Sequence, residues 1–232
     1  MQQPVGTNPS IDPARPVKPL LRGWSHAGAA VLAAAITVAL CWRSRADLPR
    51  LISLLIFGLS MVQLYTVSAL YHMGSWRPSR ARVLGAIDHS DIFVVIAGTY
   101  TPLCFNVLAG WARPAALVTI WLLAAAGVAL AIVTTRIDKV NRWLNTGLYI
   151  GMGWISILLI PAFAAALSWT AVGLMMFGGA LNTVGAVIYG RRRPNPFPRV
   201  FGFHELFHLC VIAGGAVFAA VIWIWVVPFP RA

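Results

Sequence analysis

The chain alternates between long apolar runs and short polar segments. Seven apolar runs lie at about residues 24–42, 51–72, 87–108, 115–134, 143–164, 169–189 and 203–227. Each is long enough to cross a hydrocarbon core of about 30 Å as a helix, and too long for a barrel strand. Because a spanning segment must satisfy its backbone polar groups internally, helices are favoured. The pattern predicts an all-α integral membrane protein, with a seven-transmembrane helix bundle forming one domain over residues 23–232.

Composition supports a membrane protein and excludes a separate soluble domain. Apolar residues make up 59% of the 232 positions and charged residues only 10%, with a mean hydropathy of +0.77. Soluble domains carry about 25% charged residues. Residues 1–22 differ from the rest, since they hold five prolines and few large apolar side chains. Such a segment cannot bury enough surface to fold, so we expect a disordered cytoplasmic tail.

The net charge of +12 has a topological explanation. With the N-terminus inside, thirteen basic residues fall in cytoplasmic segments: Arg15, Lys18, Arg22, Arg77, Arg80, Arg82, Arg136, Lys139, Arg142, Arg191, Arg192, Arg193 and Arg199. Five fall outside: Arg43, Arg45, Arg50, Arg113 and Arg231. Positive residues concentrate in cytoplasmic loops, so we expect a cytoplasmic N-terminus and an external C-terminus. Because the basic residues are scattered among short loops, no nucleic-acid partner is indicated.

Glycine and cysteine suggest close helix packing and no covalent framework. Gly147 and Gly151 in the fifth run, and several glycines in the sixth including Gly178 and Gly185, are predicted to let helices approach closely. Three cysteines without a Cys-x-x-Cys spacing indicate neither a disulfide framework nor a thiolate zinc site.

Three histidines form a candidate metal site. His204 and His208 are four residues apart at the start of the last run, so a helix presents both on one face. His72 ends the second run, which in the expected topology lies at the same membrane depth. Three imidazoles with an open fourth position are typical of a catalytic Zn²⁺ site. We therefore predict that His72, His204 and His208 bind Zn²⁺.

Two further polar residues are candidates for catalysis. Asp88 begins the third run at the same depth, where it could orient or deprotonate a metal-activated water. Ser68 lies four residues before His72 on the same helical face and could donate a hydrogen bond to a substrate carbonyl or oxyanion. Each also has an ordinary alternative, because a helix N-terminus favours an aspartate and serines often serve helix packing.

The remaining histidines and Glu205 are weaker candidates. His89 is a second choice as a ligand, because adjacent helical residues point about 100° apart. His26 begins the first run on the same side and is weaker still. Glu205 points away from the face of His204 and His208, and the context is not that of a zinc protease.

These motifs resemble those of the hemolysin III family, bacterial members of the progestin and adipoQ receptor (PAQR) superfamily. The resemblance rests on residues 68–72 (Ser-Ala-Leu-Tyr-His), 88–93 (Asp-His-Ser-Asp-Ile-Phe), 96–102 (Ile-Ala-Gly-Thr-Tyr-Thr-Pro), 148–154 (Leu-Tyr-Ile-Gly-Met-Gly-Trp) and 204–208 (His-Glu-Leu-Phe-His). It covers the chain from about Trp24 onward and implies a multi-pass protein of the bacterial inner membrane. It also implies a zinc held by the histidines matching His72, His204 and His208, with Ser68 and Asp88 matching the motif serine and aspartate.

One departure from that family pattern precedes His26. Hemolysin III proteins commonly carry an acidic residue or Asn shortly before this histidine, whereas residues 22–26 here read Arg-Gly-Trp-Ser-His. The resemblance therefore assigns no role to His26.

Two classes of function remain open from the sequence. The superfamily also resembles alkaline ceramidases, which implies a zinc-dependent hydrolase acting on an amide or ester of a membrane lipid. The alternative is non-enzymatic, either a cytolytic pore former or a membrane-state sensor in which the zinc is structural. A wide pore would require a continuous polar stripe, but polar residues within the runs are sparse.

Overall fold

The computed structural model describes residues 19–137 and 142–230, and every span within them is helical. The elements are α1 (Trp24–Arg43), α2 (Leu48–Met73), α3 (Pro78–Val107), α4 (Ala112–Arg136), α5 (Arg142–Trp154), η1 (Ile155–Leu159), α6 (Ile160–Ala166), α7 (Trp169–Arg191), α8 (Phe203–Val221) and η2 (Ile222–Val226). Seven spans are long and apolar enough to cross a bilayer, counting α5 to α6 as one and α8 to η2 as another. The predicted seven-helix membrane bundle is confirmed, while its orientation stays a prediction.

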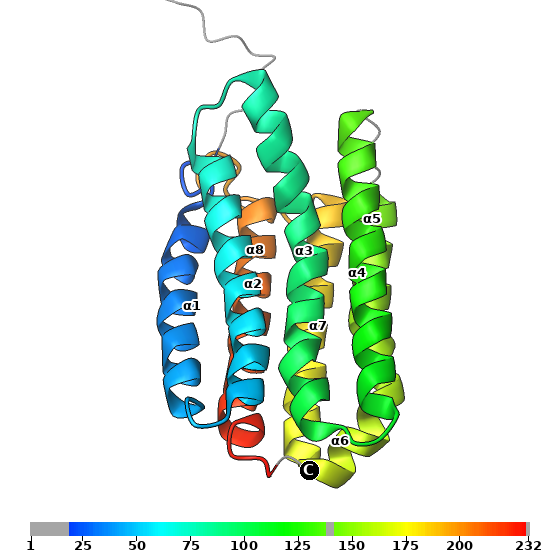
Figure 1. The fold of residues 1–232 in the computed structure, drawn as a ribbon. Coiled ribbons are helices and arrows are strands. Elements are labelled where there is room, and N and C mark those ends of the chain that lie inside the picture. The colour runs from blue at the N-terminus through cyan, green and yellow to red at the C-terminus, as the bar shows by residue number, and fades with distance from the viewer. Residues whose placement is uncertain (1–18, 138–141, 231–232) are drawn as a thin grey trace, which may run out of the picture.

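The helices run up and down side by side (Figure 1). The closest neighbours are α1 with α2, α2 with α3, α3 with α4, and α7 with α8. As a result, α2 ends and α1, α3 and α8 begin at one end of the bundle, the upper end in Figure 1. We call this the histidine end. The predicted disordered tail falls mostly on residues 1–18, which lie outside the described residues.

Residues 19–22 contact the loop before α8. They belong to the segment for which the sequence predicts a disordered tail. The backbone N–H groups of Leu20 and Leu21 donate to the carbonyls of Arg199 and Val200, at 3.1 and 3.2 Å. The Arg22 guanidinium pairs with Glu205 in the first turn of α8. The segment leading into α1 is thereby joined to the start of the helix that carries His204 and His208.

Helix α3 begins nine residues before the predicted start of its apolar run. Pro78 occupies its first turn, where a missing N–H is harmless, and Arg80 and Arg82 are exposed. Hydropathy marks where a segment enters the membrane, whereas a helix can continue past that depth. The extra turns of α3 extend beyond the histidine end (Figure 1).

The fifth span is interrupted within the membrane, which the sequence analysis did not predict. Pro161 lies in the first turn of α6 and has no N–H to continue an upstream helix. The hydroxyl of Tyr100 on α3 donates to the Gly153 carbonyl at 2.8 Å and accepts the Ser156 N–H at 2.7 Å. Tyr100 thus satisfies backbone groups that the interruption leaves unpaired, as a bilayer interior requires.

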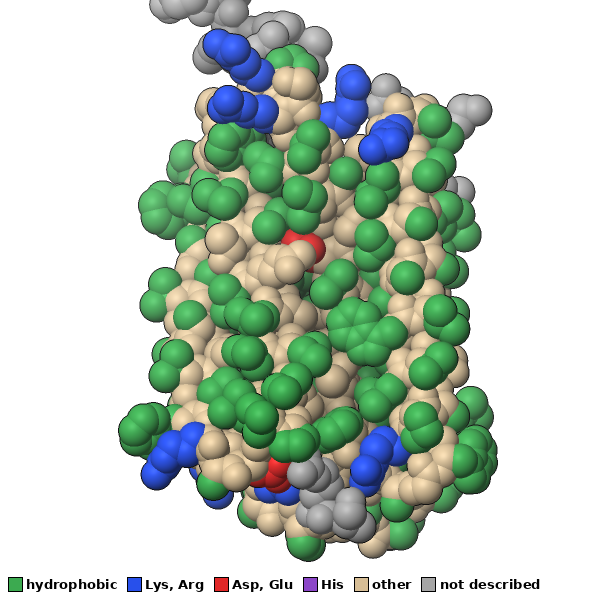
Figure 2. Space-filling model, in the orientation of Figure 1, with side chains coloured by type: hydrophobic (Ala, Val, Ile, Leu, Met, Phe, Trp, Pro, Cys, Tyr) green, Lys and Arg blue, Asp and Glu red, His purple; other side chains and the backbone are tan. Residues whose placement is uncertain are grey.

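The surface matches a protein surrounded by lipid. Figure 2 shows hydrophobic side chains over the middle of the molecule, with Lys and Arg gathered near its two ends. Inside, α7 approaches α8 closely at Gly185, where a β-carbon would lie 2.7 Å from Cys210 Cβ. Gly147 and Gly151 have no such neighbour among the described residues, so the predicted close approach holds for Gly185 and not for α5.

Candidate functional site

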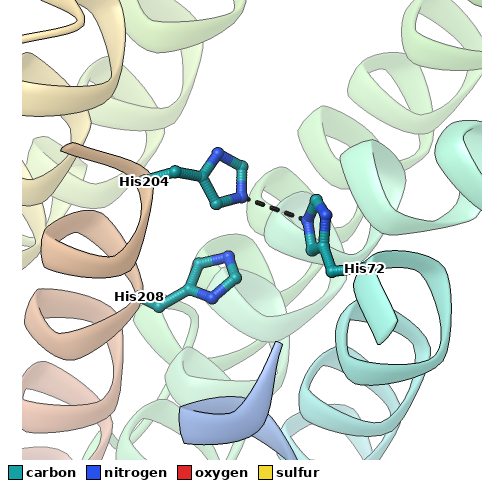
Figure 3. A group of neighbouring side chains, drawn as sticks. All are labelled: His72, His204 and His208. Carbon is teal, nitrogen blue, oxygen red and sulfur yellow. Dashed lines mark hydrogen bonds between the residues drawn. The ribbon is translucent and has the colours of Figure 1, made fainter. Parts of the chain in front are cut away.

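His72, His204 and His208 converge at the histidine end of the bundle. His72 belongs to the last turn of α2, and the other two occupy the first turns of α8. Each ring offers one nitrogen, and these three nitrogens all lie within 4.8 Å of one another. The Nε2 atoms of His72 and His204 are 3.1 Å apart (Figure 3). The helices therefore bring together the three histidines that the sequence analysis selected.

The local structure of α8 explains how His204 and His208 share a face. Gly202 is the N-cap, and its N–H donates to the Glu205 carboxylate at 2.8 Å. This contact fixes the first turn, so the two imidazoles project one turn apart with ring centroids separated by 4.5 Å. His208 is fully buried and His204 is partly buried.

The three histidines fit a metal ion. Two nitrogens bound to one tetrahedral Zn²⁺ at about 2.0–2.1 Å lie roughly 3.3 Å apart, close to the separation of the His72 and His204 Nε2 atoms. His208 Nδ1 is buried without a hydrogen-bond partner among the described residues. Buried imidazole nitrogens normally have partners, so an unpaired one beside two further imidazoles suits a cation. Neutral imidazoles accommodate Zn²⁺, Cu²⁺, Ni²⁺ or Fe²⁺, so this donor set alone does not select a metal.

Asp88 and Ser68 lie beside this cluster and contact one another. Asp88 Oδ2 is 3.7 Å from His72 Nε2. The Ser68 side chain hydrogen-bonds to the Asp88 carboxylate, so α2 and α3 are joined by a polar contact next to His72. Both residues border the same small space as His204 and His208. The two predicted catalytic residues are thus close enough to the histidines to act with them.

His26 occupies a position that the sequence analysis ranked low. Its imidazole stacks on that of His208, with centroids 3.7 Å apart and an angle of 9° between the planes. Tyr65 packs on His26 at 5.1 Å between centroids. His26 is not among the three histidines that could share a metal. It instead fixes the ring plane of His208 from the α1 side.

His89 is likewise outside the group of three histidines. It borders the small space near Asp88, and its backbone carbonyl accepts a hydrogen bond from the Tyr149 hydroxyl at 3.1 Å. This bond attaches α5 to α3 beside the cluster.

Arg22 and Glu205 form a buried ion pair that sequence reasoning missed. Only 2% of the Glu205 side chain and 18% of the Arg22 side chain are exposed. Glu205 lies outside the group of three histidines that could share a metal, and its carboxylate holds both Arg22 and the Gly202 N–H. The three-residue spacing from Gly202 to Glu205 could have indicated the contact with the Gly202 N–H, but no local pattern indicates Arg22 as the partner.

Asp91 and Gln63 form a second polar pair that the sequence analysis passed over. The Gln63 amide donates to Asp91 Oδ1 at 2.6 Å, and Asp91 is buried. Both residues lie near the midpoints of their helices, α2 and α3. The pair joins these two helices one turn deeper than Asp88.

Two adjoining cavities open from the cluster into the bundle. The smaller, of about 30 Å³, is bordered by His204, His208 and Asp88. The larger, of about 140 Å³, lies deeper and is lined mainly by apolar side chains of α2, α3, α5, α7 and α8. Five residues border both: Leu64, Ile92, Tyr149, Phe207 and Val211. An apolar chamber therefore lies directly beneath a polar, metal-competent site.

Comparison with known proteins gives the family. The model of the family described as "Haemolysin-III related" matches residues 14–219. The chain belongs to this family. The predicted membership of the PAQR superfamily is confirmed with it. The "Hemolysin-3 homolog" of Bacillus subtilis (strain 168) is 35% identical over 183 residues, which cover 77% of this chain and 80% of that protein.

A second relative gives the same result. The "Hemolysin-3" of Bacillus cereus is 33% identical over 175 residues, covering 75% of this chain and 74% of that protein. With seven helices able to span a bilayer, the chain is a hemolysin III-like multi-pass membrane protein of bacterial type.

Proposed function

We propose that this protein is a zinc-dependent hydrolase of an amide or ester bond in a membrane lipid. The observation that carries the proposal is that the two cavities adjoin, since both are bordered by Leu64, Ile92, Tyr149, Phe207 and Val211. A lipid chain in the apolar chamber would leave its head-group linkage at the histidines and Asp88. Ligand sites typically combine such an apolar wall with a few convergent polar groups.

Each residue of the site has a defined task. His72, His204 and His208 would hold the ion, which would supply Lewis-acid polarisation of a carbonyl and activation of water. Asp88 would accept the proton of the attacking water at Oδ2, the oxygen 3.7 Å from His72 Nε2, and pass it to the leaving amine or alcohol. General bases typically contribute about 10²–10⁴-fold to a rate.

Ser68 acts on Asp88 in this account, and not on the substrate. Its side chain already bonds the Asp88 carboxylate, which orients that group toward the cluster. The sequence analysis gave Ser68 a different role, as a donor to a substrate carbonyl or oxyanion, and that role stays a prediction. The orienting role of such a partner commonly affects activity about 10–100-fold.

The test is hydrolysis of N-acyl amides and acyl esters by detergent-purified protein before chelation, after chelation and after Zn²⁺ is restored. We expect activity in the wild type to disappear with the metal and return with Zn²⁺. His208→Ala should be inactive under all three conditions, whereas His89→Ala, a histidine beside the site, should behave like the wild type. Hydrolysis that survives both chelation and His208→Ala would contradict the proposal.

A structural metal is the second candidate, and one packing feature favours it. Helix α8 packs chiefly against α7 and secondarily against α1. An ion held by His72 and His204 would therefore connect α2 to α8, which is not one of the main packing partners of α2. Under this alternative, chelation lowers the melting temperature while no lipid is hydrolysed by any form of the protein.

A further inference from the structure

Two polar side chains meet α8 inside the apolar chamber, well below the histidines. A β-carbon at Gly215 would lie 2.6 Å from the Tyr65 hydroxyl, and one at Gly214 would lie 2.6 Å from the Asn182 amide nitrogen. Tyr65 comes from α2 and Asn182 from α7, and both line the larger cavity. The absence of side chains at Gly214 and Gly215 thus leaves room for both polar groups against α8, within the lining of one cavity.

No hydrogen bond of the Tyr65 hydroxyl or of the Asn182 amide is found within residues 19–137 and 142–230. Tyr65 is only 3% exposed and Asn182 is partly buried, and both border the larger cavity. Other polar groups of the chamber are already bonded: the Thr99 hydroxyl donates to the Val95 carbonyl, and Thr183 donates to Gly179. A polar group without a partner costs free energy in an apolar medium, so Tyr65 and Asn182 are suited to a ligand.

The depth of these groups is set by helix geometry. Gly214 and Gly215 follow His208 by six and seven residues, which places them roughly 10 Å farther along α8 at 1.5 Å per residue. Tyr65 precedes His72 by seven residues on α2, which gives a similar depth. An extended covalent chain advances about 3.5 Å for every three bonds. At that rate an extended acyl chain spans the roughly 10 Å between this point and the histidine cluster in about nine bonds.

We propose that Tyr65 and Asn182 form a subsite for a hydroxyl group carried in the middle of a lipid acyl chain. The inference rests on the proposed function only in requiring that a lipid chain occupies the chamber. The phenol and the carboxamide can both donate and accept, so either can bond a hydroxyl. The protein would then select chains by the presence and position of a hydroxyl, and an unsubstituted chain would leave both groups unpaired.

The test is competitive displacement of a fluorescent fatty acid from detergent-purified protein by stearic, 3-hydroxystearic and 10-hydroxystearic acids. We expect 10-hydroxystearic acid to bind roughly threefold to tenfold more tightly than the other two, as a net gain of one hydrogen bond gives. Tyr65→Phe and Asn182→Leu should reduce that preference while leaving stearic acid binding unchanged. Thr99→Val removes a chamber hydroxyl that is already bonded and should keep the preference.

Equal binding of the three acids, binding of none, or an undiminished preference in both variants would overturn the subsite. Metal content serves as the check that the Tyr65 and Asn182 variants fold. Because binding needs no turnover, the two proposals fail separately. If the protein prefers the hydroxylated acid but hydrolyses no lipid, the subsite proposal stands and the hydrolase proposal fails. If it hydrolyses lipid but shows no preference, the hydrolase proposal stands and the subsite proposal fails.

Discussion

The imidazoles of His26 and His208 lie parallel, with ring centroids 3.7 Å apart. His26 comes from α1 and His208 from α8, so this stack joins the first and last spans beside the candidate metal. The flat face of the His26 ring is its contact with the His208 imidazole. The stack restricts the plane in which His208 can present a nitrogen.

His26→Ala should therefore weaken metal binding while His26→Phe retains most of it. Groups that orient a metal ligand typically change affinity about 10–100-fold, so we expect a loss of that size for the alanine variant. Competition with a chromophoric chelator measures the affinity. Equal losses in both variants would mean that a nitrogen of His26 matters, and no loss in either would remove the orienting role.

Asp88→Asn should abolish turnover and keep the metal. The amide cannot accept the proton, so the rate should fall by about 10²–10⁴-fold. Asp91→Asn is the matched control, because Asp91 is also a buried carboxylate of α3 but bonds to Gln63 one turn away. We expect it to retain both metal and rate. If the two variants lose activity equally, a general disturbance of α3 explains the effect better than proton transfer.

Ser68→Ala should slow hydrolysis without releasing metal. The substitution removes the hydrogen bond that orients the Asp88 carboxylate, and a loss of about 10–100-fold is the usual size of such an effect. Ser68→Thr, which keeps a hydroxyl, should recover part of the rate. Kinetics on a single N-acyl amide, together with metal analysis, distinguish this from loss of the site. A wild-type rate in Ser68→Ala would exclude the orienting role.

Glu205→Ala should destabilise the protein and disturb His204. The change leaves the Arg22 guanidinium largely buried without its carboxylate and removes the bond to the Gly202 N–H. Breaking a buried pair from one side costs roughly 3 kcal/mol. Thermal unfolding in detergent measures the effect. The double variant Arg22→Met with Glu205→Gln should recover part of the loss, because no charge then remains unpaired. A melting temperature unchanged in Glu205→Ala would contradict the pair's importance.

The sequence predicted the spans well because membrane insertion depends on one property, the length of an apolar run. It predicted His72, His204 and His208 for a similar reason, since four-residue spacing and span direction place them at one depth. It did not predict the interruption after Trp154: Pro161 was a local signal, but the apolar run continues through it, and the Tyr100 bonds that satisfy the interruption come from a distant helix. The stack of His26 on His208 was not predicted for the same reason, because it joins residues far apart in the sequence.

The Arg22–Glu205 pair shows a different limit. A proline-rich segment ending at Arg22 reads as a tail by composition, yet its last residues bond the loop before α8. Local composition describes what a segment can do alone, whereas this segment is held by partners about 180 residues away.

Metal content is the most direct test of the account. Mass spectrometry of the wild type, His208→Ala and His89→Ala, each purified in detergent under the same conditions, gives the ion and its ratio to protein. We predict about one zinc per chain in the wild type and in His89→Ala, and none in His208→Ala, because three imidazoles are the usual protein ligands of one catalytic zinc. Wild-type protein without metal, or His208→Ala with the full amount, would contradict the central claim that His72, His204 and His208 hold the ion.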